Sequence, residues 1–166
     1  MSKMNYKVSI AVAALCSGSI CSAQSDNNWN VSVRVDQITD AREASAALMS
    51  SNGARLVFAC NGLVEKTLSV QFLPKEYLGS RPNLVVVRFD KDPPIPSIAW
   101  EYAYKGAYTT SEPFVEFFSK QMTEGDQAVF VRALNYEDQP IDGRFYSANG
   151  KRAINQVREA CGKPAV

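Results

Sequence analysis

An alternation of apolar and polar residues predicts that most of this chain is β-strand. In residues 29–36, Trp29, Val31, Val33 and Val35 occupy every second position, with polar residues between them. This period of two places one face of a strand in the core and the other in solvent. Further strands are predicted at residues 55–60, 64–73, 84–90, 98–105, 128–135 and 144–146.

Turn signals separate the predicted strands. Ser51 to Gly53 is one, and Asn61-Gly62 is the strongest hairpin dipeptide in the chain. Another turn is predicted at residues 139–143. Residues 84–90 are apolar on both faces over most of their length, which indicates a central strand. Residues 41–50 stay ambiguous, because their alanines favour a helix while their apolar residues also alternate.

Two segments have the period of an amphipathic helix. The first begins at Ser111, which can cap it, has Pro113 in its opening turn and ends near Gly125. The second follows Asn149 and stops at Gly162. The predicted fold class is α+β, mainly β, with antiparallel, sandwich-like sheets and two helices, one at the C-terminus. The apolar stripes are Phe114, Phe117, Phe118 and Met122 in the first helix and Ala153, Ile154, Val157, Ala160 and Cys161 in the second.

The N-terminal segment has the pattern of a secretory signal peptide. Residues 1–7 carry two lysines and no acid, and residues 8–20 form a mostly apolar run that is too short to span a bilayer. Small residues stand three and one positions before a cleavage site after Ala23. We therefore expect residues 1–23 to be removed on export, leaving residues 24–166 as a single globular domain in the periplasm.

Two alternatives to this reading of the N-terminus are open. The segment could instead be a buried strand or helix, or Cys16 or Cys21 could carry a lipid anchor. Leu15 and Ile20 precede these cysteines, whereas the residue before a lipidated cysteine is normally small. A lipoprotein is accordingly disfavoured.

Composition and charge exclude several classes of function. The whole chain has 18 Lys and Arg, 17 Asp and Glu and no His. Removing the two lysines of residues 1–23 leaves 16 basic and 17 acidic groups, so no basic surface points to nucleic acid or to an acidic membrane. The lack of histidine excludes Ser-His and Cys-His nucleophile pairs and histidine-bearing zinc sites.

Cys60 and Cys161 are the two cysteines that remain after signal removal. An even pair in an exported chain favours a structural disulfide. The loop that it closes is about 100 residues long, for which chain entropy gives roughly 4–5 kcal/mol of stabilisation. The alternative is a reactive thiol, but no histidine is present to activate one and no Cys-x-x-Cys spacing occurs.

Candidate interaction residues lie mainly around the proline-rich stretch that follows residue 92. Asp90, Asp92 and Glu101 are the densest acidic group, but nothing in their spacing shows the facing pair that a glycosidase needs, and it matches no calcium loop. Arg88 and Arg132 each stand in an apolar strand, and either could bind an anionic ligand, pair with an acid such as Asp90 or Glu101, or face solvent. Tyr108 lies beyond an aromatic strand face and is the better exposed aromatic candidate. We predict no catalytic residue, no metal site and no cofactor.

Several short blocks, taken in order, also carry a family resemblance. They are Trp29-Asn30-Val31, Ile38-Thr39-Asp40, residues 55–60, Val87-Arg88-Phe89-Asp90, Trp100, Phe114-Val115, residues 128–133 (AVFVRA), residues 143–150 (GRFYSANG), Ala153-Ile154 and Ala160-Cys161. This series resembles the VasI/TagO-like family of small exported proteins associated with type VI secretion, and more loosely the β-rich invasion-associated exported proteins. The resemblance implies a periplasmic accessory domain without established catalysis, a Cys60–Cys161 disulfide and a strand at residues 41–50.

The expected function is that of a non-enzymatic periplasmic accessory or binding protein that acts by protein–protein contact, with a link to type VI secretion implied by the resemblance. The alternative is an inhibitor or immunity protein against an exported toxin or wall hydrolase, which would aim the loop at residues 90–96 into a partner's cleft. The expected partner is another protein, either an envelope or secretion component or a toxin. No nucleic-acid partner and no membrane insertion after signal removal are expected.

Overall fold

A computed structural model describes residues 29–62, 66–80, 84–95, 100–103 and 105–166. The predicted signal peptide, its cleavage site and parts of the strands predicted at 64–73 and 98–105 lie outside the described residues. The elements in chain order are β1 (Asn30–Val35), β2 (Arg42–Met49), β3 (Arg55–Asn61), β4 (Thr67–Leu73), β5 (Val85–Phe89), β6 (Glu101–Ala103), β7 (Gly106–Thr109), α1 (Glu112–Thr123), β8 (Gln127–Leu134), β9 (Pro140–Ser147) and α2 (Gly150–Ala160).

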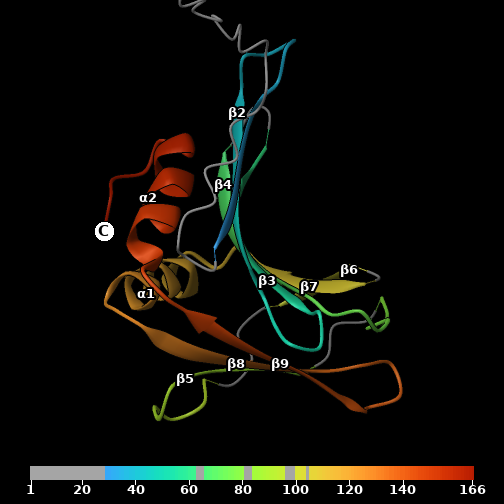
Figure 1. Ribbon diagram of the computed structural model, residues 1–166. Coiled ribbons are helices and arrows are strands. Elements are labelled where there is room, and N and C mark those ends of the chain that lie inside the picture. The colour runs from blue at the N-terminus through green and yellow to red at the C-terminus, as the bar shows by residue number, and fades with distance from the viewer. Residues whose placement is uncertain (1–28, 63–65, 81–83, 96–99, 104) are drawn as a thin grey trace, which may run out of the picture.

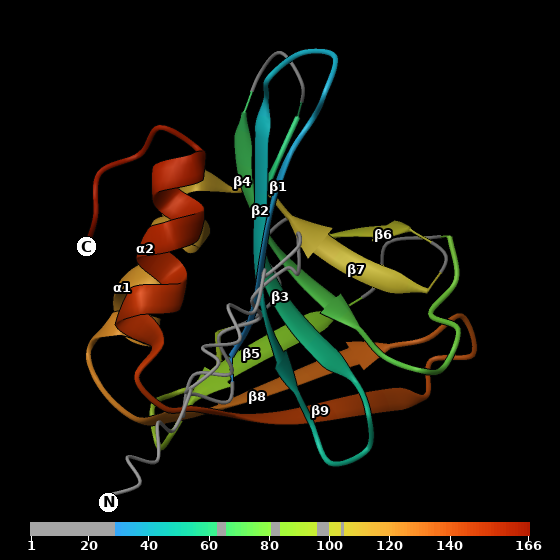
Figure 2. The same cartoon turned by 45° about the horizontal axis from the view of Figure 1, so that its top comes forward.

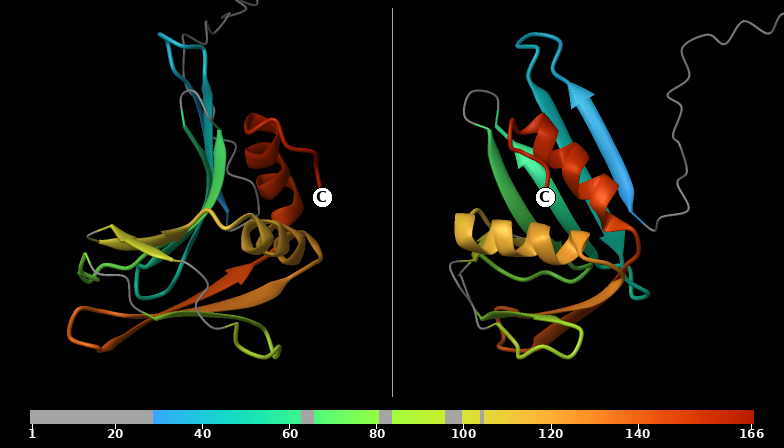
Figure 3. Two further views of the ribbon diagram at one scale, coloured as in Figure 1. Left: turned by 180° about the vertical axis from the view of Figure 1, so that it is seen from behind. Right: turned by 90° about the vertical axis from the view of Figure 1, so that its left-hand side faces the viewer.

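The described strands form two antiparallel sheets (Figures 1 and 2). The larger sheet has the order β1-β2-β3-β4-β7-β6, and the smaller has the order β5-β8-β9. The larger sheet bends between β4 and β7, and both helices and the smaller sheet lie on its convex side (Figure 3). The predicted fold class, mainly β with antiparallel sheets and two helices, one at the C-terminus, is confirmed.

Aromatic side chains from every layer meet in one core. Phe58 of β3 stacks on Phe118 of α1 with ring centroids 6.0 Å apart, and Phe89 of β5 meets the same ring edge-on at 6.0 Å. Phe72 of β4 contacts Phe145 of β9 at 6.2 Å, which joins the two sheets. All five of these rings are almost fully buried, and such aromatic pairs contribute about 0.5–1.5 kcal/mol each beyond area burial.

The segment at residues 41–50 is a strand, as the resemblance implied and against its helix propensity. On β2, Ala44, Ala46 and Leu48 are buried beneath α2. Helix propensities differ by only tenths of a kcal/mol per residue, which is less than the free energy gained by burying one alternating apolar face.

Four details of the predicted strands are wrong. The strand predicted at residues 98–105 ends at Ala103, and β7, which was not predicted, pairs antiparallel with it. Only the start of the first strand enters the core: Trp29 is 4% exposed but Val35 is 54% exposed, because β1 extends beyond α2 (Figure 3). The strand at residues 84–90 is an edge strand and not a central one, since among the described strands β5 pairs with β8 alone, apart from a bridge to Ile95. The last turn lies before Pro140 and not at 139–143, so β9 is longer than predicted.

The position of that last turn is set by an asparagine side chain. Asn135 Oδ1 accepts the backbone N–H groups of Glu137 and Gln139, each at 2.9 Å, and Asp138 adopts a φ of 59°. This local bonding reverses the chain immediately after β8.

The predicted disulfide is present. Cys60 lies in β3, Cys161 follows α2, and their Cα atoms are 5.5 Å apart. The ammonium group of Lys66 donates a hydrogen bond to the Ala160 carbonyl at 2.9 Å next to the bridge. The crosslink and this bond fasten the C-terminal end of α2 to the larger sheet.

A buried tyrosine joins β6 of the larger sheet to β8 of the smaller sheet. The Tyr102 hydroxyl of β6 donates to the Leu134 carbonyl of β8 at 2.9 Å. Burial raises the pKa of Tyr102 to about 12, so the hydroxyl stays protonated and available as a donor.

Candidate functional site: the open face of the larger sheet

One face of the larger sheet is uncovered. The helices and the smaller sheet pack on its convex side, and within the described ranges no element packs against the concave side of β1 to β4 (Figure 3). We call the side chains of β1 to β4, β6 and β7 that point to this concave side the open face.

The strand register builds the open face in rows of directly opposed side chains. Ser32, Ser45, Ala59 and Ser69 make one row across β1 to β4. The next row runs through Asn30, Ala47, Val57, Gln71, Tyr108 and Glu101, from β1 to β6. Small side chains therefore occupy the middle of the face, with longer polar ones around them.

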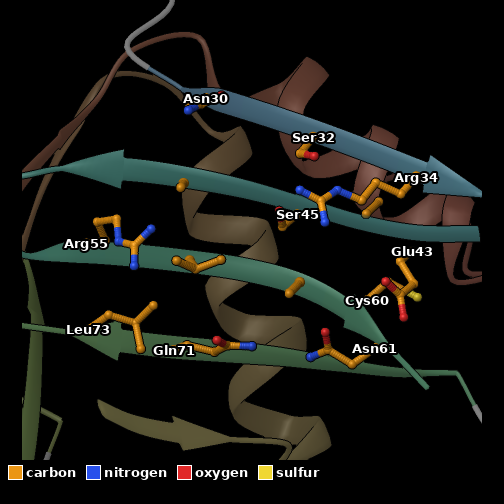
Figure 4. A pocket seen from close by; sticks show the side chains of 14 residues that line it. Asn30, Ser32, Arg34, Glu43, Ser45, Arg55, Cys60, Asn61, Gln71 and Leu73 are labelled. Atoms are coloured by element: carbon orange, nitrogen blue, oxygen red, sulfur yellow. The ribbon is translucent and has the colours of Figure 1, made fainter. Parts of the chain in front are cut away.

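These rows enclose an open groove of about 570 Å³ (Figure 4). Its floor consists of Ser45, Ala47 and Ala59. Arg55 and Arg34 stand at its rim, on β3 and β1. The lining is mainly polar, so the groove suits a polar or charged surface of a partner.

A buried serine orients the amides on the groove's other side. The Ser69 hydroxyl accepts the side-chain NH₂ groups of Asn61 at 3.0 Å and of Gln71 at 3.1 Å, and Ser69 itself is 2% exposed. These bonds orient both amides, each through one of its two N–H groups, and leave the side-chain oxygens of Asn61 and Gln71 as acceptors for a partner's donors.

Tyr108 lies on the open face, at its β7 end. Its hydroxyl is hydrogen-bonded to the Glu101 carboxylate, and this bond, with a smaller effect of burial, raises the pKa of Tyr108. The bond holds the ring across the β6–β7 hairpin. Among the candidate residues from the sequence, Tyr108 is the one that falls on this face.

The other three candidates lie on the smaller sheet. Arg88 points to the solvent side of β5, and Asp90 and Asp92 form the turn after it. Asp90 Oδ1 accepts the Ala128 N–H at 2.8 Å, and the Asp90 N–H donates to the Ala128 carbonyl at 2.7 Å. Asp90 therefore closes the end of β5 onto β8.

The acidic group of the sequence is divided between the two sheets. Glu101 lies on β6 of the larger sheet, while Asp90 and Asp92 lie beside β5 of the smaller one. Within the described residues no cluster of three or more acidic or cysteine side chains could hold a metal ion.

Sequence reasoning missed most of the groove. Alternation alone puts Arg55 and Gln71 on the polar sides of their strands, but only the register shows that these sides form one surface. The sequence also offers no reason to single out Phe130 and Arg144, which lie directly across the smaller sheet from Arg88.

Comparisons with protein-family models, curated proteins and solved structures give no match to this chain. None of the helices in the described ranges combines the length and apolar character needed to cross a membrane.

Proposed function

We propose that this protein is a non-enzymatic binding protein of the periplasm that acts by contact with another protein through the groove on its open face. The observation that carries the proposal is the groove itself, whose floor of small side chains is bordered by arginines and oriented amides. The resemblance in the sequence makes an envelope or secretion component the expected partner.

The floor residues support this role because they are a poor choice for a strand that faces only water. Alanine is depleted in strands, where measured preferences span about 1 kcal/mol. Ala47 and Ala59 nevertheless occupy central positions of the open face. Small side chains at these positions let a partner's side chains approach the sheet closely, and the polar rim supplies hydrogen bonds and charge.

The crosslink supports the proposed compartment. A disulfide between two buried cysteines is typical of proteins that fold in oxidising compartments such as the periplasm.

Filling the groove tests the proposed contact. Ser45→Tyr and Ala47→Tyr, together, should reduce recovery of the partner by at least about tenfold in affinity purification of the mature protein from its own periplasm. Tyrosine is a good strand former, so we expect the free energy of unfolding to change little.

Val33→Tyr is the matched control, because Val33 is 53% exposed on the opposite face of β1. It should leave recovery unchanged. Equal recovery with the groove filled and unfilled would refute the proposed contact. If the groove-dependent partner is a toxic hydrolase, the protein is an inhibitor and not an accessory component.

A further inference from the structure

A row of three side chains crosses the solvent face of the smaller sheet, away from the groove. Arg88 of β5 is directly opposite Phe130 of β8, and Phe130 is directly opposite Arg144 of β9. Both arginines are exposed, and Phe130 is half-buried between them.

The ring orients both cations. The guanidinium carbon of Arg88 lies 4.8 Å from the centroid of Phe130, and that of Arg144 lies 5.2 Å from it. In each contact the cation is attracted by the negative face of the aromatic ring. Two long side chains that would otherwise sample many rotamers are thus held over one ring, which lowers the entropy that a ligand must remove on binding.

Neither cation forms a salt bridge within the part of the chain that the structure describes. Among the described residues, no carboxylate lies within 4.0 Å of the guanidinium of Arg88 or Arg144. The neighbouring row shows the opposite arrangement, since Arg132 binds Asp142 through two hydrogen bonds of 2.7 Å each. Asp90, the nearest acid in sequence to Arg88, accepts the Ala128 N–H instead.

We propose that Arg88, Phe130 and Arg144 bind the carboxylates of an acidic segment of a partner polypeptide. The planar guanidinium fork matches a carboxylate in two parallel hydrogen bonds. Leu84, Val86 and Pro94 line a hollow of about 610 Å³ beside the row and give the segment an apolar surface to pack on.

The distance between the strands determines how far apart the acidic residues of this ligand must be. Arg88 and Arg144 are two strands apart, about 9–10 Å between backbones, and residues i and i+2 of an extended chain are about 7 Å apart. Acidic residues two or three positions apart on an extended segment can therefore engage both cations at once.

The charge around the row favours an acidic polypeptide over a nucleic acid. Asp90 and Asp92 line the same hollow as Arg88 and Arg144. They repel every polyanion, but a phosphate backbone carries a charge at every residue, whereas a peptide can place its carboxylates at the two cations alone. Residues 24–166 also carry 17 acidic and 16 basic groups, so the chain has no excess of positive charge that would attract a polyanion.

Hexaglutamate binding to the mature protein, residues 24–166, tests the proposal. We expect saturable binding that weakens as salt is raised, no binding of hexaglutamine, and at least about tenfold weaker binding of hexaglutamate by the variant Arg88→Gln/Arg144→Gln. The matched control is Lys151→Gln/Arg152→Gln, which removes the same charge from the exposed side of α2 and should leave affinity unchanged.

Three results would overturn the proposal: no binding of hexaglutamate by the wild type, equal loss of affinity in both double variants, or tighter binding of a single-stranded oligonucleotide than of hexaglutamate. Circular dichroism of each variant confirms that it is folded. Because the row and the groove lie on different sheets, filling the groove should not change hexaglutamate binding. The proposed acidic-segment site and the proposed function of the groove can therefore be refuted independently.

Discussion

Replacing Cys60 and Cys161 by alanine should lower the free energy of unfolding of the domain, residues 24–166, by about 2–5 kcal/mol. The two cysteines are 101 residues apart in sequence and join the end of β3 to the end of α2. In the reduced, unfolded chain these ends separate freely, so loss of the bridge increases the entropy of the unfolded state. This loss is a large part of the total stability of an ordinary domain, about 5–15 kcal/mol.

Urea unfolding of the oxidised protein and of the double alanine variant measures this difference. Wild-type protein held in excess reductant is the control and should unfold at nearly the same urea concentration as the variant. A difference below about 1 kcal/mol between the oxidised protein and the variant would show that the crosslink contributes little.

Arg158→Ala should destabilise the protein by about 2–4 kcal/mol, because Arg158 is 3% exposed and joins α2 to α1 and the C-terminal tail. Its Nη1 donates to Glu116 Oε2 at 2.8 Å and to Ser119 Oγ at 3.3 Å, and its Nε donates to the Pro164 carbonyl at 2.7 Å. The substitution leaves a cavity and removes one partner of the buried Ser119 hydroxyl, together with the bonds to the part-exposed Glu116 carboxylate and to the Pro164 carbonyl.

Two further variants test whether the loss of stability comes from this network and not from the removal of a surface charge. Arg152 is exposed on the same helix, so Arg152→Ala should change the free energy of unfolding by less than about 0.5 kcal/mol. Glu116→Gln should cost about 1 kcal/mol, since the Glu116 side chain is 39% exposed and an amide oxygen can still accept from Arg158. Thermal unfolding of the three variants measures how much stability each one loses. A loss for Arg158→Ala as small as that for Arg152→Ala would contradict the predicted ranking.

Local pattern was enough to predict most elements of the fold. The period of two gave β1, β3, β4 and β8, the helical period gave α1 and α2, and the pair Cys60 and Cys161 gave the crosslink. These features depend on neighbouring residues or on the cysteine count, and a sequence displays both.

Features that depend on pairing could not be predicted in this way. Residues 84–90 are apolar enough for a central strand, yet β5 lies at an edge of the smaller sheet, and the choice of neighbouring strand is not encoded in these residues alone. Nothing local to Arg158 indicates that a cation in the α2 stripe is buried. Its partners come from another helix and from the tail.

The candidate surfaces show the same limit. Arg88 and Tyr108 were predicted as interaction residues, but they lie on different sheets, and the side chains around each become neighbours only through the register. The groove floor has no sequence signal beyond small residues at alternate positions, which many buried strands also have.

The central claim is that the open face meets a partner protein in the periplasm. Photocrosslinking in living cells tests it most directly, with a benzophenone side chain in place of Ser45 in the groove or of Arg152 on the solvent side of α2. We predict one discrete crosslinked product from position 45 and none from position 152. No product from position 45, or the same product from both positions, would contradict the claim.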